Sequence, residues 1–149
     1  MRRLSSWRSA RVLGLDTSAF IYHVEGHPVY APRVGRVFRE IENGHARGVT
    51  STLTFLEVLV GPYRAGDQAR RIALSGLLAS FPGVSWVALD LVVADRAASL
   101  RGRYRLRTPD AIQLATALEA GADAFLTNDQ QLSRVTEVPV LLIDEMTDR

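Results

Sequence analysis

The sequence predicts a single-domain α/β protein, in which an α/β/α sandwich surrounds a mostly parallel sheet of about five strands. The chain has 149 residues, enough for one domain with a buried core, and 47% of them are hydrophobic. Short runs of β-branched and large apolar residues alternate along it with longer segments of helical character. Strands that alternate with helices form parallel sheets covered on both faces and joined by right-handed crossovers.

Five short segments have the composition of buried strands, and six longer segments have that of helices. The expected strands are 11–15, 48–51, 84–89, 124–127 and 138–143. The expected helices are 18–23, 32–44, 53–61, 67–80, 91–104 and 109–120. The last helix has the clearest boundaries, because Thr108 suits its N-cap, Pro109 its first position and Gly121 its end. We expect residues 1–10 to form a flexible extension ahead of a domain that spans residues 11–149.

The composition excludes several classes of site. The chain has no cysteine, so disulfides, thiolate nucleophiles and cysteine-ligated zinc are ruled out. All 18 basic residues are arginine, which rules out P-loop phosphate binding and Schiff-base chemistry because both need a lysine. No apolar run reaches transmembrane length and the N-terminus lacks the apolar core of a secretory signal. We therefore expect a cytoplasmic protein with no membrane partner.

Four acidic residues are predicted to gather at one edge of the sheet. Asp16 and Asp129 directly follow the first and fourth strands, and Glu57 lies early in the helix after the second strand. In a parallel sheet, the C-terminal strand ends and the helix N-termini that follow them meet at one edge, where ligands bind. Asp110 lies in the first turn of a helix that follows another helix, so its placement is less constrained.

Each of these acids also has a purely structural interpretation. Asp16 and Asp129 could be turn residues after strands. Asp110 could serve only to stabilise its helix dipole, by about 0.3–1 kcal/mol. Glu57 lies in the apolar run TLTFLEVLVG, where an unpaired buried carboxylate would be costly, so its structural alternatives are to turn outward to solvent or to pair with a distant arginine.

Strand order decides which acids belong together. Asp90 and Asp144 also end strands, so position along the chain does not separate them from Asp16 and Asp129. If the first and fourth strands are neighbours in the centre of the sheet, Asp16 and Asp129 lie about 5 Å apart in the hydrogen-bonding direction. Asp90 and Asp144 would then end outer strands, far from the other acids.

Four carboxylates in one pocket repel one another. Two unit charges about 4 Å apart interact by about 4 kcal/mol at an effective dielectric constant of about 20. Either some of the carboxyl groups stay protonated or a divalent cation lies among them, and an all-oxygen acidic cluster suits Mg²⁺ or Mn²⁺. Such sites promote phosphodiester cleavage by activating water and stabilising charge on the leaving oxygen.

Three blocks of the sequence resemble the signature motifs of PIN-domain ribonucleases, in particular the VapC-like toxins of bacterial type II toxin–antitoxin modules. The blocks are LDTSAFIY, TLTFLEVLVGP and TPDAIQLATALEAGADAFLTND, and the similarity extends over about residues 12–145. The resemblance implies an α/β/α sandwich with the first and fourth strands central. It also implies a Mg²⁺- or Mn²⁺-dependent endoribonuclease, in which Asp16, Glu57, Asp110 and Asp129 form the catalytic and metal-binding acidic tetrad.

The same resemblance extends to further residues and to partners. It implies that Thr17, Ser18 and Asn128 orient the metal ligands or contact the water around the metal. It implies RNA as the substrate, a homodimer, and a cognate antitoxin that often places an arginine among the carboxylates. Large apolar residues in SAFIYHV and TFLEVLVGPY are either core or part of a groove in which such an antitoxin docks.

Arginines occupy every second position in the segment just before Asp110. Arg103, Arg105 and Arg107 are either solvated charges near a helix C-terminus or contacts to the RNA phosphates beside the site.

Two other functions remain open from the sequence. One is a PIN nuclease that acts in RNA processing without an antitoxin. The other is a catalytically inactive PIN-like interaction module, against which the intact set of four acids counts. A metal titration separates the inactive module from the nucleases, and the neighbouring gene separates the two nucleases.

Overall fold

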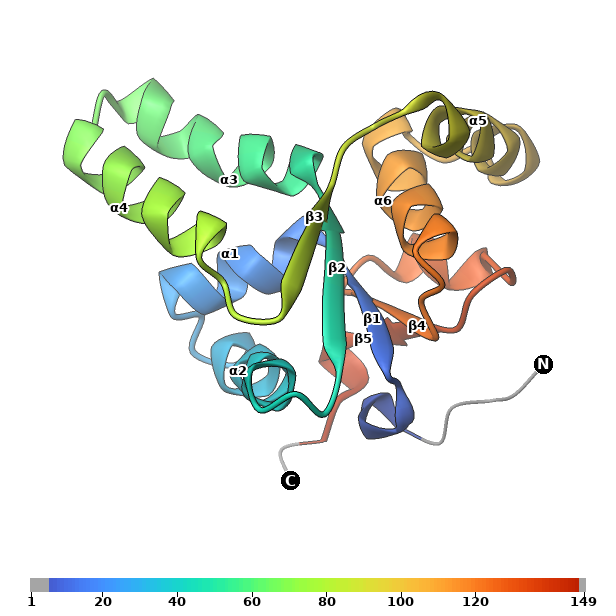
Figure 1. The fold of residues 1–149 in the computed structure, drawn as a ribbon, viewed down its shortest axis with the longest axis horizontal. Coiled ribbons are helices and arrows are strands. Elements are labelled where there is room, and N and C mark those ends of the chain that lie inside the picture. Colours follow the sequence, from blue (N-terminus) through green and yellow to red (C-terminus); the bar gives the residue numbers. More distant parts are fainter. Residues whose placement is uncertain (1–5, 148–149) are drawn as a thin grey trace.

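The structure, a computed structural model, describes residues 6–147 and contains the predicted parallel sheet. All four strand pairs are parallel, and the order β3-β2-β1-β4-β5 places β1 and β4 side by side within the sheet (Figure 1). The strands are β1 (Val12–Leu15), β2 (Arg47–Ser51), β3 (Val84–Val87), β4 (Ala124–Thr127) and β5 (Val140–Leu142). This order confirms the predicted α/β fold and the pairing on which the shared acidic edge depends.

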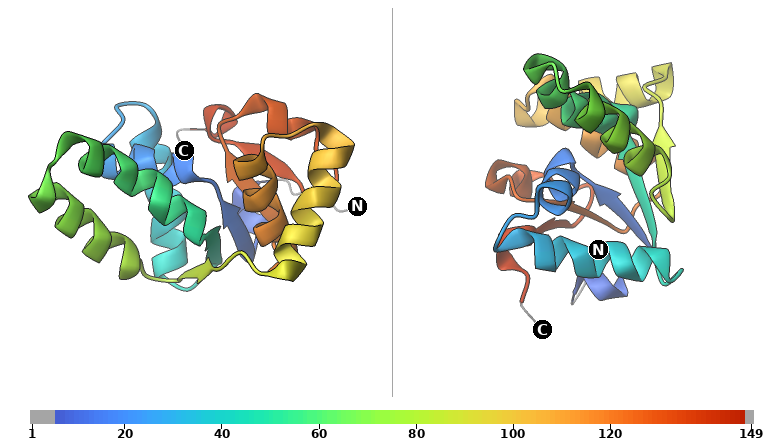
Figure 2. Two further views of the ribbon diagram at one scale, coloured as in Figure 1. Left: turned by 90° about the horizontal axis from the view of Figure 1, so that it is seen from above. Right: turned by 90° about the vertical axis from the view of Figure 1, so that its left-hand side faces the viewer.

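Helices cover both faces of the sheet. They are α1 (Thr17–Glu25), α2 (Tyr30–Glu42), α3 (Thr52–Ala65), α4 (Gln68–Ala79), α5 (Leu91–Tyr104) and α6 (Thr108–Glu119). Leu13 and Leu15 of β1 belong to the core that includes α1 and α2, whereas Phe125 of β4 packs with α5 and α6. The helices α3 and α4 form a hairpin that extends to one side of the sheet (Figures 1 and 2). The layers are those of an α/β/α sandwich.

Several helix boundaries differ from the expected ones. The helix α1 begins at Thr17, because Asp16 is its N-cap and accepts a hydrogen bond from the Thr17 amide at 2.8 Å. The N-cap of α6 is Arg107 rather than Thr108, and it makes no side-chain capping bond. The helix α3 continues four residues beyond its expected end, through Pro62, until Gly66 ends it in a left-handed conformation with φ 64°.

The approach of α6 to the sheet depends on a glycine. A Cβ atom at Gly14 of β1 would lie 2.5 Å from Ala117 Cβ and 2.9 Å from a ring carbon of Phe125. Because Gly14 has no side chain, α6 packs closely over β1. This contact sets the distance between the helix that carries Asp110 and the strand that leads to Asp16.

Part of the segment expected to be a flexible extension is packed into the core. Trp7 lies in the short 3-10 helix η1 (Trp7–Ser9), and both Trp7 and Ala10 are buried in the main core cluster. Burial of a large indole side chain is favourable enough to order this segment, so the expectation fails for residues 7–10. Residues 1–5 lie outside the described part of the chain. Within residues 6–147, no helix is long and apolar enough to span a membrane.

Candidate active site

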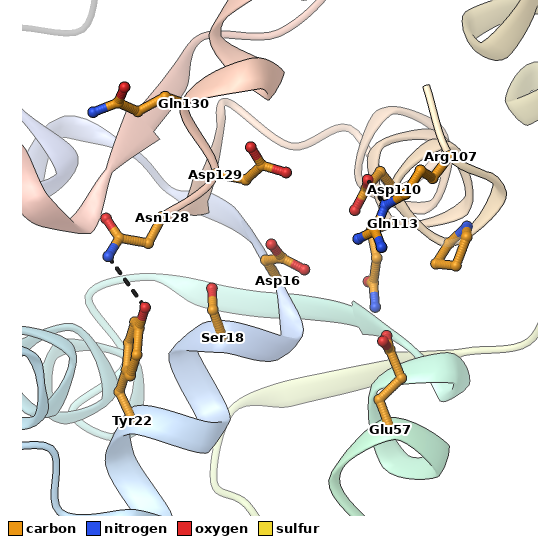
Figure 3. Close-up of a pocket in the computed structure, with 11 residues that line it drawn as sticks. Asp16, Ser18, Tyr22, Glu57, Arg107, Asp110, Gln113, Asn128, Asp129 and Gln130 are labelled. Carbon is orange, nitrogen blue, oxygen red and sulfur yellow. Dashed lines mark hydrogen bonds and ion pairs between the residues drawn. The ribbon is translucent and has the colours of Figure 1, made fainter. Parts of the chain in front are cut away.

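A cavity of about 440 Å³ opens at the C-terminal edge of the sheet, and all four predicted acids line it (Figure 3). Asp16 follows β1, Asp129 follows β4, Glu57 projects from α3, and Asp110 lies in the first turn of α6. The remaining lining residues are Ser18, Tyr22, Arg107, Pro109, Gln113, Asn128 and Gln130. The topology of the sheet therefore brings together carboxylates that are far apart in the sequence.

Asp16 is held by two hydrogen bonds. The Thr17 amide donates to its Oδ1 at 2.8 Å, and the Thr127 hydroxyl donates to its Oδ2 at 2.6 Å. Burial raises the pKa of Asp16 to about 6; these two bonds oppose the rise, and the charges of Asp110 and Glu57 add to it. The folded protein therefore disfavours the ionised form of Asp16, and a cation in the cavity would offset that cost.

Thr127, the last residue of β4, connects two of the acids. Its Oγ1 donates to Asp16 and accepts the backbone N–H of Asp129 at 3.1 Å. Asp129 also caps the short 3-10 helix η2 (Gln130–Arg134), because its Oδ1 accepts the Gln131 amide at 3.0 Å. Asp129 is thus both a turn residue and a cavity-lining carboxylate. Thr127 was not among the site residues predicted from the sequence; its place two residues before Asp129 in FLTND was the available signal.

Arg107 lies next to Asp110 at the wall of the cavity. Its Nε donates to Asp110 Oδ2 at 3.2 Å, while its side chain stays 79% exposed and that of Asp110 is 14% exposed. The bond and the charge of Asp110 raise the pKa of Arg107 above its usual value, and the charges of Asp129 and Glu57 act in the same direction. The negative charges of the cavity therefore stabilise the positive charge of Arg107.

Glu57 is an exposed residue whose carboxylate is nevertheless anchored. The Thr17 hydroxyl donates to its Oε1 at 2.9 Å. Thr17 in turn lies in a buried polar cluster with Thr54 and Gln113. Glu57 thus turns away from its apolar sequence neighbours, and among the described residues its bonding partner is a hydroxyl group rather than an arginine.

Ser18 and Asn128 line the cavity in different ways. The Oγ of Ser18 is buried without a hydrogen-bond partner in the described part of the chain. The amide of Asn128 is engaged at both ends, because Nδ2 donates to the Tyr22 hydroxyl at 3.1 Å and Oδ1 accepts the Asp144 amide at 2.9 Å. Asn128 therefore braces the end of β4 against α1, and Ser18 is the freer of the two to contact a bound group.

The three arginines before Asp110 do not share one environment. Arg107 lines the cavity, but Arg103 and Arg105 do not. Arg103 Nη1 lies 2.6 Å from Glu137 Oε1 in an ion pair. Arg105 is the C-cap of α5 in a left-handed conformation with φ 55°.

The acids of the outer strands lie outside the cavity, as the strand order requires. Asp90 follows the edge strand β3 and caps α5, accepting the Val93 amide at 2.8 Å. Asp144 follows the opposite edge strand β5 and accepts the Tyr30 hydroxyl at 2.7 Å. The carboxylate of each therefore accepts a hydrogen bond that stabilises the local fold.

The donor chemistry of the cavity fits a hard divalent cation, although the carboxylates are spaced openly. Within residues 6–147, no three Asp, Glu or His side chains converge closely enough to enclose an ion as they stand. Mg²⁺ keeps several of its water molecules and binds through one or two carboxylates, so an open, acid-lined cavity suits it. The candidate ligand atoms are oxygens, the donor set that Mg²⁺ and Mn²⁺ prefer.

Comparisons with known proteins agree on the family and the fold. The sequence matches the family model of the PIN domain over residues 14–138. A toxin–antitoxin complex from Klebsiella pneumoniae is similar with a TM-score of 0.65 and 25% identity, over 91% of this chain and 99% of that chain. No curated protein matches the chain.

Two further solved structures are similar in fold at lower identity. VapBC2 from Rickettsia felis, bound to a promoter DNA fragment, has a TM-score of 0.72 and 12% identity, over 88% of this chain and 98% of that chain. VapBC-1 from nontypeable Haemophilus influenzae has a TM-score of 0.70 and 18% identity, over 90% of this chain and 99% of that chain.

Replacement of Asp16 by asparagine should stabilise the metal-free fold at neutral pH. Well above the folded-state pKa of about 6, Asp16 is ionised in both folded and unfolded chains, so the folded state carries the full burial cost. That cost is about 1–3 kcal/mol and disappears as the pH falls through about 6 towards about 4, because the folded chain binds the proton first. The gain in unfolding free energy, measured with urea in EDTA, should therefore be largest near neutral pH and shrink on acidification.

The exposed Asp95 on α5 provides a matched control for this substitution. Asp95→Asn makes the same change of charge outside the cavity and should show no such pH-dependent gain. An Asp16→Asn protein that is no more stable than the parent near neutral pH would contradict the burial cost.

Proposed function

The chain belongs to the PIN-domain family, and we propose that it is a divalent-metal-dependent endoribonuclease, the toxin of a type II toxin–antitoxin pair. The observation that carries this proposal is the convergence of Asp16, Glu57, Asp110 and Asp129 on one cavity. A protein that only binds other proteins has no use for four like charges placed together, since their repulsion and desolvation cost free energy. A site that holds a cation does.

We assign each residue of the cavity a separate role. Asp16, Asp110 and Asp129 hold Mg²⁺ or Mn²⁺, and Glu57 completes the set. When bound, the cation supplies activation of the attacking water and stabilisation of charge on the leaving oxygen. Thr127 keeps Asp16 oriented through its 2.6 Å hydrogen bond. Arg107 lies at the cavity wall next to Asp110, and its exposed guanidinium is placed to bind an RNA phosphate.

Two other functions differ from this one in measurable ways. An inactive PIN-like interaction module would bind a partner but neither bind a divalent cation nor cleave RNA. A PIN nuclease of RNA processing would cleave RNA but have no inhibitory partner. A small upstream reading frame that encodes a DNA-binding antitoxin would favour the toxin over this second alternative.

Asp16→Asn, Asp110→Asn and Asp129→Asn should each reduce RNA cleavage by about 100-fold or more, equivalent to about 2.7 kcal/mol in the barrier. Each change removes one negative charge from the proposed cation site while keeping the size of the side chain. Cleavage of a labelled RNA in Mn²⁺ measures the effect, circular dichroism checks the fold, and Asp95→Asn is the control. Wild-type cleavage by any of the three variants, or cleavage that persists in EDTA, would refute the assignment.

Arg107→Gln should weaken RNA binding and reduce its dependence on salt by about one unit of the logarithmic slope, as expected for the loss of one phosphate contact. Fluorescence anisotropy in EDTA measures binding without cleavage. Arg105→Gln removes the same charge two residues away, from a side chain that does not line the cavity, and should leave the slope unchanged. Equal slopes for both variants would return Arg107 to the role of a solvated helix-end charge.

A second hollow, of about 240 Å³, lies beside the first and suits an inhibitory partner. It is bounded by α1, α3 and α4, and Glu57 lines both hollows. Its lining is mostly apolar, and its charged residues are acidic except for one arginine. The apolar residues include Ile21, Val24, Val58, Pro62 and Leu74, and the charged residues are Glu25, Glu57, Asp67 and Arg70. We infer that an amphipathic helix or extended segment of an antitoxin docks here and directs an arginine towards the carboxylates. The toxin–antitoxin complex from Klebsiella pneumoniae supports this choice of partner.

Co-expression with an upstream reading frame should yield a copurifying complex and relieve growth arrest caused by this protein. Val24→Asp should abolish copurification, because it places a charge in the apolar part of the hollow and adds to its acidic lining, while RNA cleavage persists. Ile72→Asp on α4 is the control, since Ile72 is 56% exposed and does not line the hollow. If the upstream product neither copurifies nor relieves the arrest, a PIN nuclease without an antitoxin becomes the better account.

The proposal includes a homodimer. The start of α5 exposes three apolar side chains close together in sequence: Leu89 is 50% exposed, Leu91 88% and Val92 60%. Exposed apolar patches of this kind mark interaction surfaces, and this one lies apart from both hollows.

A further inference from the structure

Gln113 is a buried polar residue on a helix whose buried positions are mostly apolar. It lies on α6 among Ala111, Leu114 and Ala115, and only 3% of its surface is exposed. Burying a neutral amide costs about 1–3 kcal/mol unless its hydrogen bonds are made. It follows Asp110 by three residues, so the two side chains share one face of the helix. An apolar residue would pack here at lower cost, so a glutamine at this position depends on the hydrogen bonds that its amide makes.

Both amide hydrogens of Gln113 are donated to buried threonines. Its Nε2 lies 2.8 Å from Thr54 Oγ1 and 3.3 Å from Thr17 Oγ1. Thr17 donates its own hydroxyl hydrogen to Glu57 Oε1 at 2.9 Å. Gln113 therefore acts on Glu57 through a single hydroxyl group.

Counting hydrogens sets the direction of the bonds in this cluster. Thr50 donates its hydroxyl hydrogen to the Leu15 carbonyl at 2.9 Å, so it accepts from Thr54 at 2.7 Å. The hydroxyl hydrogens of Thr54 and Thr17 are then both committed, and the remaining hydrogens come from the Gln113 amide. The Thr17 and Thr54 hydroxyl oxygens already face each other at 3.2 Å without a hydrogen between them. Turning the amide over would add an Oε1 contact of the same kind to both threonines, so Oε1 points away from them.

The result is a buried, unpaired acceptor on a residue that lines the cavity. Gln113 Oε1 is buried without a hydrogen-bond partner in residues 6–147. Gln113 lines the acidic cavity between Asp110 and Glu57 (Figure 3). Buried carbonyl oxygens are rarely left without a donor. Gln113 thus leaves one acceptor unmet while its amide donates twice to the threonines, an arrangement that packing alone would not require.

We propose that Gln113 is a positioning residue of this site: it orients the Thr17 hydroxyl that holds Glu57 in place for cation binding. This role rests on the proposed nuclease function and deepens it. Glu57 lies on an exposed part of α3, where a free side chain would sample several rotamers. Restraining it in advance reduces the conformational entropy that is lost when a cation binds.

Gln113→Met separates this role from packing. Methionine keeps the size and flexibility of the side chain but neither donates to Thr17 nor offers the amide oxygen. The fold should tolerate the change, because the threonine hydroxyls keep the bonds that they donate themselves and the new side chain is apolar. A purely structural glutamine would leave cation binding unaffected when replaced in this way.

Calorimetric titration with Mn²⁺ in the absence of RNA measures the role without relying on activity. Gln113→Met should weaken Mn²⁺ binding and lower the kcat of RNA cleavage by about 10-fold or more, as losses of residues that orient metal ligands do. RNA binding in EDTA should stay unchanged. Thr17→Val should weaken Mn²⁺ binding as well, and the double variant should lose less than the sum, because both changes act on the same bond to Glu57.

Thr116→Val is the matched control, and the outcomes separate the two proposals. Thr116 is buried on the same helix, but its hydroxyl donates to the Ile112 carbonyl at 2.7 Å and does not line the cavity. If the parent protein binds Mn²⁺ and cleaves RNA and a folded Gln113→Met protein does the same, the inference is overturned and the nuclease stands. If Gln113→Met does not fold, Thr17→Val decides by the same criterion. If the parent neither binds Mn²⁺ nor cleaves RNA, both proposals fall.

Discussion

The placement of four carboxylates around one open cavity is the constraint on which the site depends. Parallel pairing of β1 with β4 places Asp16 and Asp129 at adjacent strand ends, and α3 and α6 add Glu57 and Asp110. Each of the four carboxylates accepts at least one hydrogen bond on a side-chain oxygen, and this bond restrains its orientation. Burial, with a smaller contribution from the charges of Asp110 and Glu57, raises the pKa of Asp16 to about 6, so the folded state bears a cost for holding this charge.

Most of the groups that restrain the carboxylates belong to rigid elements; the exception is Arg107, which bonds to Asp110 from the turn between α5 and α6. Thr127 belongs to β4, Thr17 begins α1 and Gln113 lies within α6. Gly14 lets α6 approach β1 closely enough for these elements to meet. Sites built on helices and strands keep their geometry more closely than sites on loops. The cavity is therefore open to solvent yet has walls that belong to the buried core.

Much of this arrangement could be predicted from the sequence. The features that could not be predicted depend on tertiary contacts, which leave no pattern along the chain. The alternation of strands and helices predicted the sheet, and the order of its strands separates Asp16 and Asp129 from the acids of the outer strands. Alternation alone did not show that Arg107 lines the cavity while Arg103 pairs with Glu137, because that depends on how the chain turns between α5 and α6. Gln113 was missed because its partners come from other elements, and Trp7 because an isolated aromatic residue has no periodic pattern.

The central claim is that the four acids form one cation site, and locating the ion tests it most directly. Anomalous diffraction at the manganese edge, from crystals of the protein grown with Mn²⁺, would place the ion without reference to activity. The account predicts an anomalous peak in the cavity, within bonding distance of oxygens from Asp16, Asp110 or Asp129 or of the water that they hold. A cavity without an anomalous peak in crystals whose Mn²⁺ lies elsewhere on the protein would contradict it.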